Sequence, residues 1–284
     1  MKFYVAKLNV NGNIFVDPID LDNIIEKKIP NHLLKFKSES DLDLSYIDKL
    51  DGSKWGLYDV KEINGQERII YGNLVRTVEM ERNLLDDNVL TEDKVPFSYF
   101  SKFFYVVEKE YLIFQSTTNI NYEDFLIYFK KMMEFDNGIS EIGEIELILL
   151  TKTDEIEDIL LKKLITKLDF YFVQPNNRRN FNKIQDIFNE SNSKKGNVTL
   201  ENSEGLKTTE GTDKDKLTDN VKEIVELTNN GYGSINMSYK NNREDKKVIN
   251  ISSENYKITD STSEKQLETE SGMIEFINKF IRKM

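Results

Sequence analysis

The stretch Phe103-Phe-Tyr-Val-Val-Glu-Lys-Glu-Tyr-Leu-Ile-Phe114 decides the fold class of this chain. Aromatic and β-branched residues fill both sides of a short charged segment, Glu108-Lys109-Glu110. Such residues are enriched in strands, and a charged break between two apolar runs is typical of a turn. The stretch therefore predicts a buried β-hairpin.

A helix, a strand, a second helix and a second strand are expected to follow this hairpin. Asn121 is suited to cap the first helix, because its side-chain oxygen can accept hydrogen bonds from the free N–H groups of the first turn. Strands are expected at 143–150 and 166–173, with the second helix beginning near Asp154. The apolar face of the first helix consists of Tyr122, Phe125, Leu126, Phe129 and Met133, which recur at helical spacing.

This order of elements predicts an α+β fold with mixed or antiparallel sheets and covering helices, and a two-layer sandwich in the middle of the chain. We expect four parts along the sequence. They are a β-rich domain at 1–97, the α/β sandwich at 98–190, a flexible polar linker at 191–215, and a helix-hairpin-helix segment at 216–284 that packs on the middle domain.

Upstream of the hairpin, residues 2–10 have the composition of a strand, and a helix over 20–29 is expected to stop at Pro30. The pair Asn64-Gly65 separates two strand candidates at 54–63 and 68–79. Both residues tolerate positive φ, so the pair predicts a second hairpin. Residues 83–96 are polar and include Pro96, which predicts a loop.

Downstream, a helix over 217–228 is expected to end at Asn230-Gly231, with the glycine in the left-handed conformation. A hairpin at 232–252 follows. The last helix carries a stripe of Met273, Phe276, Ile277, Phe280 and Ile281. This stripe either packs in the core or docks a protein partner or a second copy of the chain.

The composition excludes several classes of function. The chain has no cysteine and one histidine, His32, so it has no disulfides, no thiolate nucleophile and no conventional zinc site. We interpret His32 as an ordinary histidine of a loop or helix end. The formal charge of −11 disfavours binding of nucleic acid by bulk charge. No apolar run approaches the ~20 residues that cross a bilayer, and no secretory segment is evident at the start, so a cytoplasmic location without membrane contact is expected.

The most basic local feature is the segment from Gln174 to Lys183, QPNNRRNFNK. Arginine, asparagine and glutamine side chains suit phosphate and base-edge contacts, and the start of a helix adds positive potential. The alternative is a polar connection whose charge is balanced by nearby acids. The candidate nucleic-acid-binding residues are Asn177, Arg178, Arg179, Lys183 and Lys167, and Lys162 and Lys163 are further candidates by proximity in sequence.

A second candidate site is the pair Glu144 and Glu146, which are two residues apart on a predicted strand. A magnesium-dependent nuclease needs two or three converging carboxylates, and this spacing places two on one face. The alternative is the solvent face of an amphipathic strand. Glycine-rich phosphate loops and a GxSxG motif are absent from the sequence. We therefore assign no catalytic residue, no metal site and no cofactor.

Five further segments bear on the family of the chain: KFYVAKLNV (2–10), IIYGNLVRTVE (69–79), LDFYFVQPNN (168–177), NGYG (230–233) and KVINISSENY (247–256). Together they resemble an uncharacterised bacterial family, domain of unknown function 4747. The resemblance implies a setting among bacterial anti-phage and mobile-element genes, and it implies no catalytic residues.

We therefore expect a defence-associated protein that acts by binding a nucleic acid, DNA or RNA, or a protein partner, rather than by catalysis. Two alternatives stay open: a carboxylate-magnesium nuclease, and a structural or oligomerising component of a defence complex.

Overall fold

The computed structural model describes residues 1–11, 18–36, 44–65, 67–86, 89–135, 138–175, 190–191, 193–210 and 216–283. Strands in antiparallel sheets and covering helices make it an α+β protein, which confirms the expected fold class. The chain forms two compact units. The first unit is Met1–Phe3, Asp22–Ile145 and Ser261–Phe276; the second is Tyr4–Leu21, Glu146–Asp260 and Ile277–Met284.

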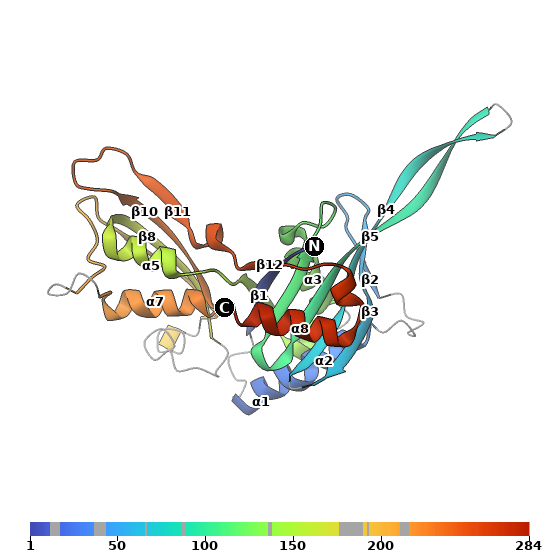
Figure 1. Cartoon of the computed structure of the whole chain (residues 1–284), viewed down its shortest axis with the longest axis horizontal. Helices are drawn as coiled ribbons and strands as arrows, with labels where there is room; N and C mark the ends of the chain where they lie inside the picture. The colour runs from blue at the N-terminus through green and yellow to red at the C-terminus, as the bar shows by residue number, and fades with distance from the viewer. Residues whose placement is uncertain are drawn as a thin grey trace. The chain divides into compact units, whose positions relative to one another are not determined.

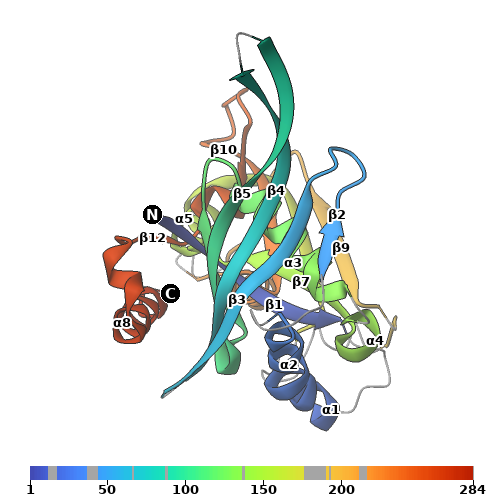
Figure 2. The same ribbon diagram turned by 90° about the vertical axis from the view of Figure 1, so that its right-hand side faces the viewer.

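The sheet of the first unit confirms both predicted hairpins. Phe103 lies opposite Phe114, and Asn64 lies opposite Arg68. The strands lie in the order β6-β5-β4-β3-β2, and neighbours are antiparallel. Figure 2 shows β5, β4, β3 and β2 of this sheet. Their bounds are β2 Ser45–Ile47, β3 Lys54–Asn64, β4 Arg68–Asp86, β5 Val89–Val106 and β6 Tyr111–Ser116.

The loop predicted for residues 83–96 is wrong, because β4 and β5 continue through it as a two-stranded ribbon (Figure 1). Strand β3 pairs with β4 only as far as Thr77, whereas β4 and β5 stay paired to Asp86 and Val89. A ribbon that no further strand joins has two accessible faces, so a polar sequence is compatible with it. The boundary predicted after residue 97 also falls within β5, so the compact units divide the chain differently from the predicted domains.

The prediction that the helix near the N-terminus stops at Pro30 is wrong. Helix α1 (Pro18–Asn23) leads into a π-helical turn, η1 (Ile24–Lys28), and then into α2 (Ile29–Leu34). The Ile29 N–H donates to the Ile24 carbonyl, five residues back, and Pro30 falls in the first turn of α2. Proline is tolerated there because its missing N–H is not needed, and the wider π-turn removes the usual break.

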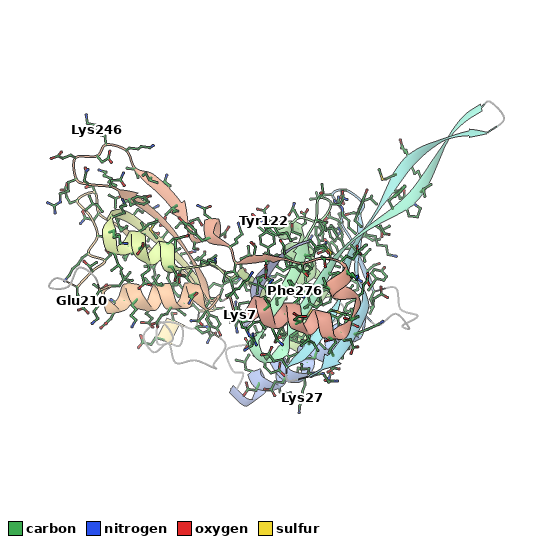
Figure 3. The ribbon with its side chains drawn as sticks, in the orientation of Figure 1. Lys7, Lys27, Tyr122, Glu210, Lys246 and Phe276 are labelled. Carbon is green, nitrogen blue, oxygen red and sulfur yellow. The ribbon has the colours of Figure 1, made fainter. Side chains whose placement is uncertain are left out.

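Helices cover both faces of the first sheet. Helix α3 (Tyr122–Glu134) begins at Asn121 as predicted, since the Asn121 Oδ1 accepts from the N–H groups of Glu123 and Asp124 at 2.8 and 2.9 Å. Its Phe125 stacks on Phe114 with ring centroids 4.2 Å apart. On the other face, α8 (Glu270–Ile281) carries Phe276, which is labelled in Figure 3. The centroid of its ring lies 6.3 Å from that of Phe104. The remaining short elements are α4 (Gly138–Ile142), η2 (Val107–Lys109) and η4 (Lys265–Glu268).

The stripe of α8 lies inside the protein. Met273, Phe276, Ile277 and Phe280 are at most 7% exposed, which favours the core interpretation of this stripe. Among the described residues, no helix combines the length and apolarity needed to span a membrane.

The second unit contains a four-stranded antiparallel sheet in the order β11-β10-β8-β9. Strand β9 lies within the segment 191–215, where a polar linker is expected from the sequence. Helix α7 ends as predicted, with Gly231 at φ +74°. Three strands have residues in both units: β1 (Lys2–Asn11), β7 (Glu144–Leu149) and β12 (Thr259–Ser261). The bounds of the other elements are α5 Asp154–Lys162, β8 Leu164–Val173, β9 Lys195–Glu201, α7 Asp219–Asn229, β10 Gly233–Lys240, β11 Ile249–Ser252 and η3 Ser253–Tyr256.

Candidate nucleic-acid interface

The two faces of the four-stranded sheet differ in chemistry. Residues Leu168, Phe170 and Phe172 of β8 lie in one hydrophobic cluster with Leu160 of α5 and Ile224 of α7. Side chains alternate between the faces of a strand, so Lys167, Asp169 and Tyr171 lie on the face opposite these helices, and Tyr171 is also partly packed against residues of the cluster. This alternation creates one apolar and one polar face.

The strand register extends the polar face across all four strands. Asp169 lies between Asn236 of β10 and Thr199 of β9, and Lys167 lies between Ser238 and Glu201. Strand β11 adds two more polar residues at its own register positions. We call this surface the polar sheet face and define it by Lys167, Asp169, Tyr171, Asn197, Thr199, Asn236, Ser238, Asn250 and Ser252.

The polar sheet face is open to solvent. Asn236, Asn250, Asn197 and Thr199 are exposed, and Lys167 keeps 39% of its side-chain surface. A shallow hollow of about 460 Å³ lies over β8, β10 and β11. Lys167, Asn236 and Asn250 line it, together with Asn255 beyond the end of β11. The hollow therefore combines amide groups with one lysine and one carboxylate, that of Asp169.

Charge on this face is locally compensated. The Lys167 Nζ lies 3.0 Å from the Asp169 Oδ2, and the Thr199 hydroxyl donates to the Asp169 Oδ1 at 2.7 Å. The hydrogen bond from Thr199, and then that from Lys167, lowers the pKa of Asp169, whereas Asp169 raises the pKa of Lys167. Both groups are charged at neutral pH, so the pair adds no net charge, and Glu201, opposite Lys167 on β9, adds an exposed carboxylate.

The rest of the face offers hydrogen-bonding groups and one aromatic ring. The Ser238 hydroxyl donates to the Asn250 Oδ1 at 2.8 Å, which orients that amide. Tyr171 is partly exposed, and burial and then the nearby Glu146 carboxylate raise its pKa. The phenol therefore stays neutral at physiological pH. Amides, hydroxyls and a neutral ring suit base-edge contacts and stacking better than proton transfer.

The structure tests only part of the site expected from the sequence. Lys167 lies at the centre of the polar sheet face. Asn177, Arg178, Arg179 and Lys183 lie outside the described residues. The two further lysines do not form one patch with Lys167. Lys162 pairs with Asp158 of its own helix at 2.9 Å, and Lys163 donates to the Asn241 side chain at 3.0 Å.

The carboxylate pair does not assemble a metal site in the described part of the chain. Glu146 forms an ion pair with Lys195 at 2.8 Å, and Glu144 is exposed. No group of three or more histidine, aspartate or glutamate residues that could hold a metal ion occurs among the described residues. The two acids therefore fit the solvent-face interpretation.

His32 is a core residue. It is 1% exposed, and its Nε2 lies 3.4 Å from the Met132 carbonyl oxygen. The nearest carboxylate, that of Glu141, is 3.9 Å from the Nδ1 and accepts two hydrogen bonds from Lys35. A histidine without solvent access cannot exchange protons directly with a substrate, so this arrangement is structural.

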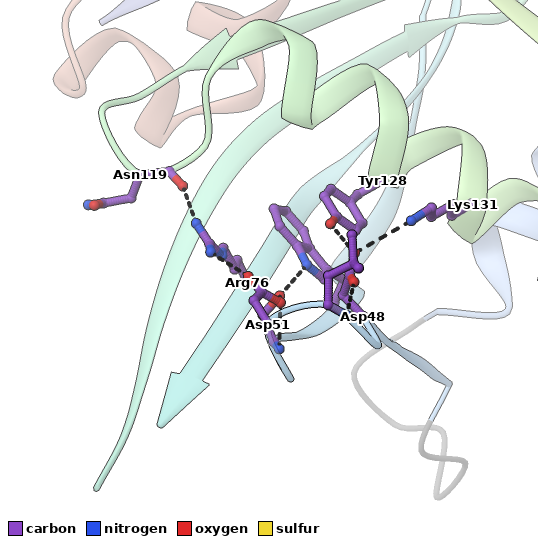
Figure 4. A network of polar contacts seen from close by, with 9 residues as sticks. Asp48, Asp51, Arg76, Asn119, Tyr128 and Lys131 are labelled. Atoms are coloured by element: carbon purple, nitrogen blue, oxygen red, sulfur yellow. Dashed lines mark hydrogen bonds and ion pairs between the residues drawn. The ribbon is translucent and has the colours of Figure 1, made fainter. Parts of the chain in front are cut away.

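A second polar cluster, in the first unit, connects the β2–β3 turn to α3 (Figure 4). Tyr128 donates to the Asp48 carboxylate, and the Lys131 Nζ lies 3.6 Å from the same group. The Arg76 guanidinium donates to Asp51 at 2.8 Å. Each carboxylate in this cluster is engaged within the unit, so we interpret the cluster as a structural fastening of the turn.

The asparagines and serines of β10 and β11 were not identified as candidates from the sequence. Ser234, Asn236 and Ser238 alternate with Ile235 and Met237 in SINMSYK. A period of two with small polar residues at every second position signals an exposed polar face. This alternation in the sequence indicates the polar face of β10. Only the strand register shows that this face lies beside Lys167 of β8.

The family described as a domain of unknown function (DUF4747) matches the chain over residues 1–279. A search among curated proteins found no significant match.

Proposed function

The chain belongs to the DUF4747 family, and we propose that it is a cytoplasmic binding protein of bacterial anti-phage defence that takes up single-stranded nucleic acid on the polar sheet face. The anti-phage setting comes from the family resemblance, and the ligand class comes from the chemistry of the face. Binding rather than catalysis is proposed because the face offers hydrogen-bonding and stacking groups without an evident catalytic set.

The observation that carries the proposal is the open, polar face of a four-stranded antiparallel sheet whose other face packs against helices over β8 and β10. Sheets of this kind present bases with a flat platform on which aromatic rings stack and amides read base edges. Tyr171 supplies the ring, and Asn236 and Asn250 supply the amides. Duplex DNA hides its base edges in grooves that a flat sheet does not enter, so single strands are the favoured ligand.

The compensated charge of the polar sheet face predicts how binding should depend on salt concentration. Lys167 is paired with Asp169, so phosphate attraction at the sheet itself is weak. Each phosphate contact on a single strand contributes a slope of about −0.7 to the dependence of log affinity on log salt concentration. We therefore expect the polar sheet face to contribute little to the salt dependence of binding, and Arg178 and Arg179 to contribute more of it.

The test is fluorescence anisotropy with labelled single-stranded DNA and RNA of about 16 nucleotides, the upper end of the site size of single-strand-binding domains. Tyr171→Leu is expected to weaken binding roughly tenfold or more, because stacking contributes about 1–3 kcal/mol per base. The pair Asn236→Ala with Asn250→Ala should weaken it as well. Lys222→Ala is the matched control, because Lys222 is an exposed residue of α7, on the helical side of the sheet.

Two outcomes would overturn the proposal. One is the absence of binding to DNA and RNA single strands at low salt. The other is unchanged affinity in the Tyr171 and asparagine variants. A separate measurement addresses the anti-phage setting: loss of phage resistance in cells carrying Tyr171→Leu, with normal protein levels, would support it.

A further inference from the structure

A second hollow lies in the first unit, on the sheet face that α8 covers. Its volume is about 350 Å³, and its walls come from β3, β4 and β5 on one side and from Leu267 and Met273 on the other. Binding pockets for small molecules range from about 300 to 1,000 Å³, so the hollow can enclose one small ligand. It shares no residue with the polar sheet face.

The strand register arranges the side chains of this hollow in two rows. Lys61 lies opposite Tyr71, and Tyr71 lies opposite Phe104. In the next row, Asn73 lies opposite Lys102. Directly opposed residues have Cβ atoms about 4.5–5.5 Å apart. Two cations therefore flank an aromatic and amide floor, and the Tyr71 and Phe104 rings are nearly parallel, with 23° between their planes.

Neither lysine is neutralised by a carboxylate. Lys61 and Lys102 form no ion pair with another residue in the described part of the chain, and the Lys102 Nζ lies 5.7 Å from the centroid of the Phe100 ring. Many other described lysines do pair with carboxylates, as Lys109 pairs with Glu67 at 3.2 Å. In a chain with 50 acidic residues and a net charge of −11, a hollow lined by two lysines and one carboxylate, that of Asp59, favours an anionic ligand.

Asn73, which lines the hollow, adds an amide to the two lysines. Its Oδ1 is inaccessible to solvent and has no hydrogen-bond partner among the described residues, whereas more than about 90% of buried polar groups have one. The Asn73 amide is therefore a polar group of this hollow that protein contacts leave unsatisfied.

The backbone at the edge of the hollow is also unusual. Asp59, which lines it, has φ +54°, and the β3–β4 register shifts between Tyr58 and Lys61. Bulges re-aim side chains and are over-represented beside active sites. Asp59 is exposed, so its carboxylate can accept hydrogen bonds from the hydroxyl groups of a ligand.

From these groups we infer that the hollow binds a nucleoside monophosphate. The phosphate would lie between Lys61 and Lys102, and the base would lie against Tyr71, with the Asn73 amide at its edge. Asp59 would accept from the ribose hydroxyls. This site is independent of nucleic-acid binding by the second unit.

The test is isothermal titration calorimetry of the full chain with adenosine, guanosine, cytidine and uridine monophosphates. We expect one site per chain for at least one of them. Lys61→Gln combined with Lys102→Gln should weaken binding tenfold or more, and Asn73→Ala should weaken it as well. Lys94→Gln, an exposed lysine of the β5 ribbon, is the charge-matched control and should bind as the wild type does.

Inorganic phosphate and adenosine serve as partial probes, and each should bind more weakly than the best nucleotide. Inorganic phosphate binding as tightly as the nucleotides would overturn the inference in favour of a simple anion site. No heat with any nucleotide at millimolar concentration, or unchanged affinity in the folded double-lysine variant, would overturn it outright. Tyr171→Leu should leave nucleotide binding unchanged, which separates this site from the polar sheet face.

Discussion

The rings of Trp55 and Tyr128 stack face to face, with centroids 3.7 Å apart and planes 5° from parallel. Trp55 belongs to β3 and is 1% exposed, and Tyr128 belongs to α3. The Trp55 Nε1 donates to the Ser53 Oγ at 2.8 Å, and the Tyr128 hydroxyl donates to Asp48. One stacked pair therefore joins the helix, the sheet and the β2–β3 turn.

Replacing Tyr128 by phenylalanine is expected to destabilise the first unit by about 1–2 kcal/mol, because the Asp48 carboxylate loses a donor while the ring stack remains. Trp55 is the single tryptophan and lies in this unit, so its fluorescence reports the unfolding. Lys130→Gln on the same helix is the control. Equal stability of the Tyr128 variant and the wild type would mean that the turn is not held by this hydrogen bond.

The same cluster predicts a loss of stability in acid. The Tyr128 hydrogen bond lowers the pKa of Asp48, and the hydrogen bonds from Ser53 lower that of Asp51. A folded-state pKa below the unfolded value stabilises the fold at pH values above about 4, and this contribution is lost as the pH falls further. Denaturant titrations from about pH 3, where carboxylates titrate, to about pH 7 measure this contribution. The acid-induced loss of unfolding free energy should be smaller in Tyr128→Phe than in the wild type. An equal loss in both proteins would contradict the assignment to Asp48.

Gly231→Ala is expected to destabilise the second unit by about 2–4 kcal/mol. The position has φ +74°, which costs a residue with a Cβ about 1–2 kcal/mol. An added Cβ would also lie 2.5 Å from the Lys7 Cβ, which requires the backbone or its neighbour to shift. Far-UV circular dichroism during denaturation measures the change. Gly52→Ala is the control, because φ there is +72° but nothing lies within 4 Å of the added atom.

Asp59→Gly is expected to raise stability by about 0.5–1 kcal/mol while weakening nucleotide binding. Glycine occupies the left-handed region without steric cost, and the aspartate at φ +54° does not. Thermal unfolding followed through Trp55 and calorimetry with the best nucleotide measure the two effects. A variant that loses stability would show that Asp59 makes a structural contribution instead.

Features that depend on neighbours in sequence were predictable. Asn121 caps α3 because a short side chain reaches N–H groups two and three residues ahead. The Phe103–Phe114 hairpin follows from strand propensity on both sides of a charged turn. Gly231 ends α7 because glycine tolerates positive φ. In each case the interacting groups lie within a few residues, so local chemistry was sufficient.

Features that depend on the surroundings of a segment were missed. Pro30 was predicted to stop a helix, but the π-turn before it accommodates the ring. Residues 83–96 were predicted as a loop because their composition lacks a buried face. A ribbon that stands apart from the other strands needs none. In both places the conformation of neighbouring chain overrode the preference of the residues themselves.

The sequence by itself determined the α+β class, the main hairpins, the helix caps and the absence of cysteine chemistry, because composition and short spacings carry that information. Only the tertiary structure decided which polar residues share a surface. Lys167 meets Asn236 and Asn250, and Lys61 joins Lys102 and Asn73, through strand register. Register brings residues tens of positions apart within a few ångströms, and no pattern in a single sequence specifies that pairing.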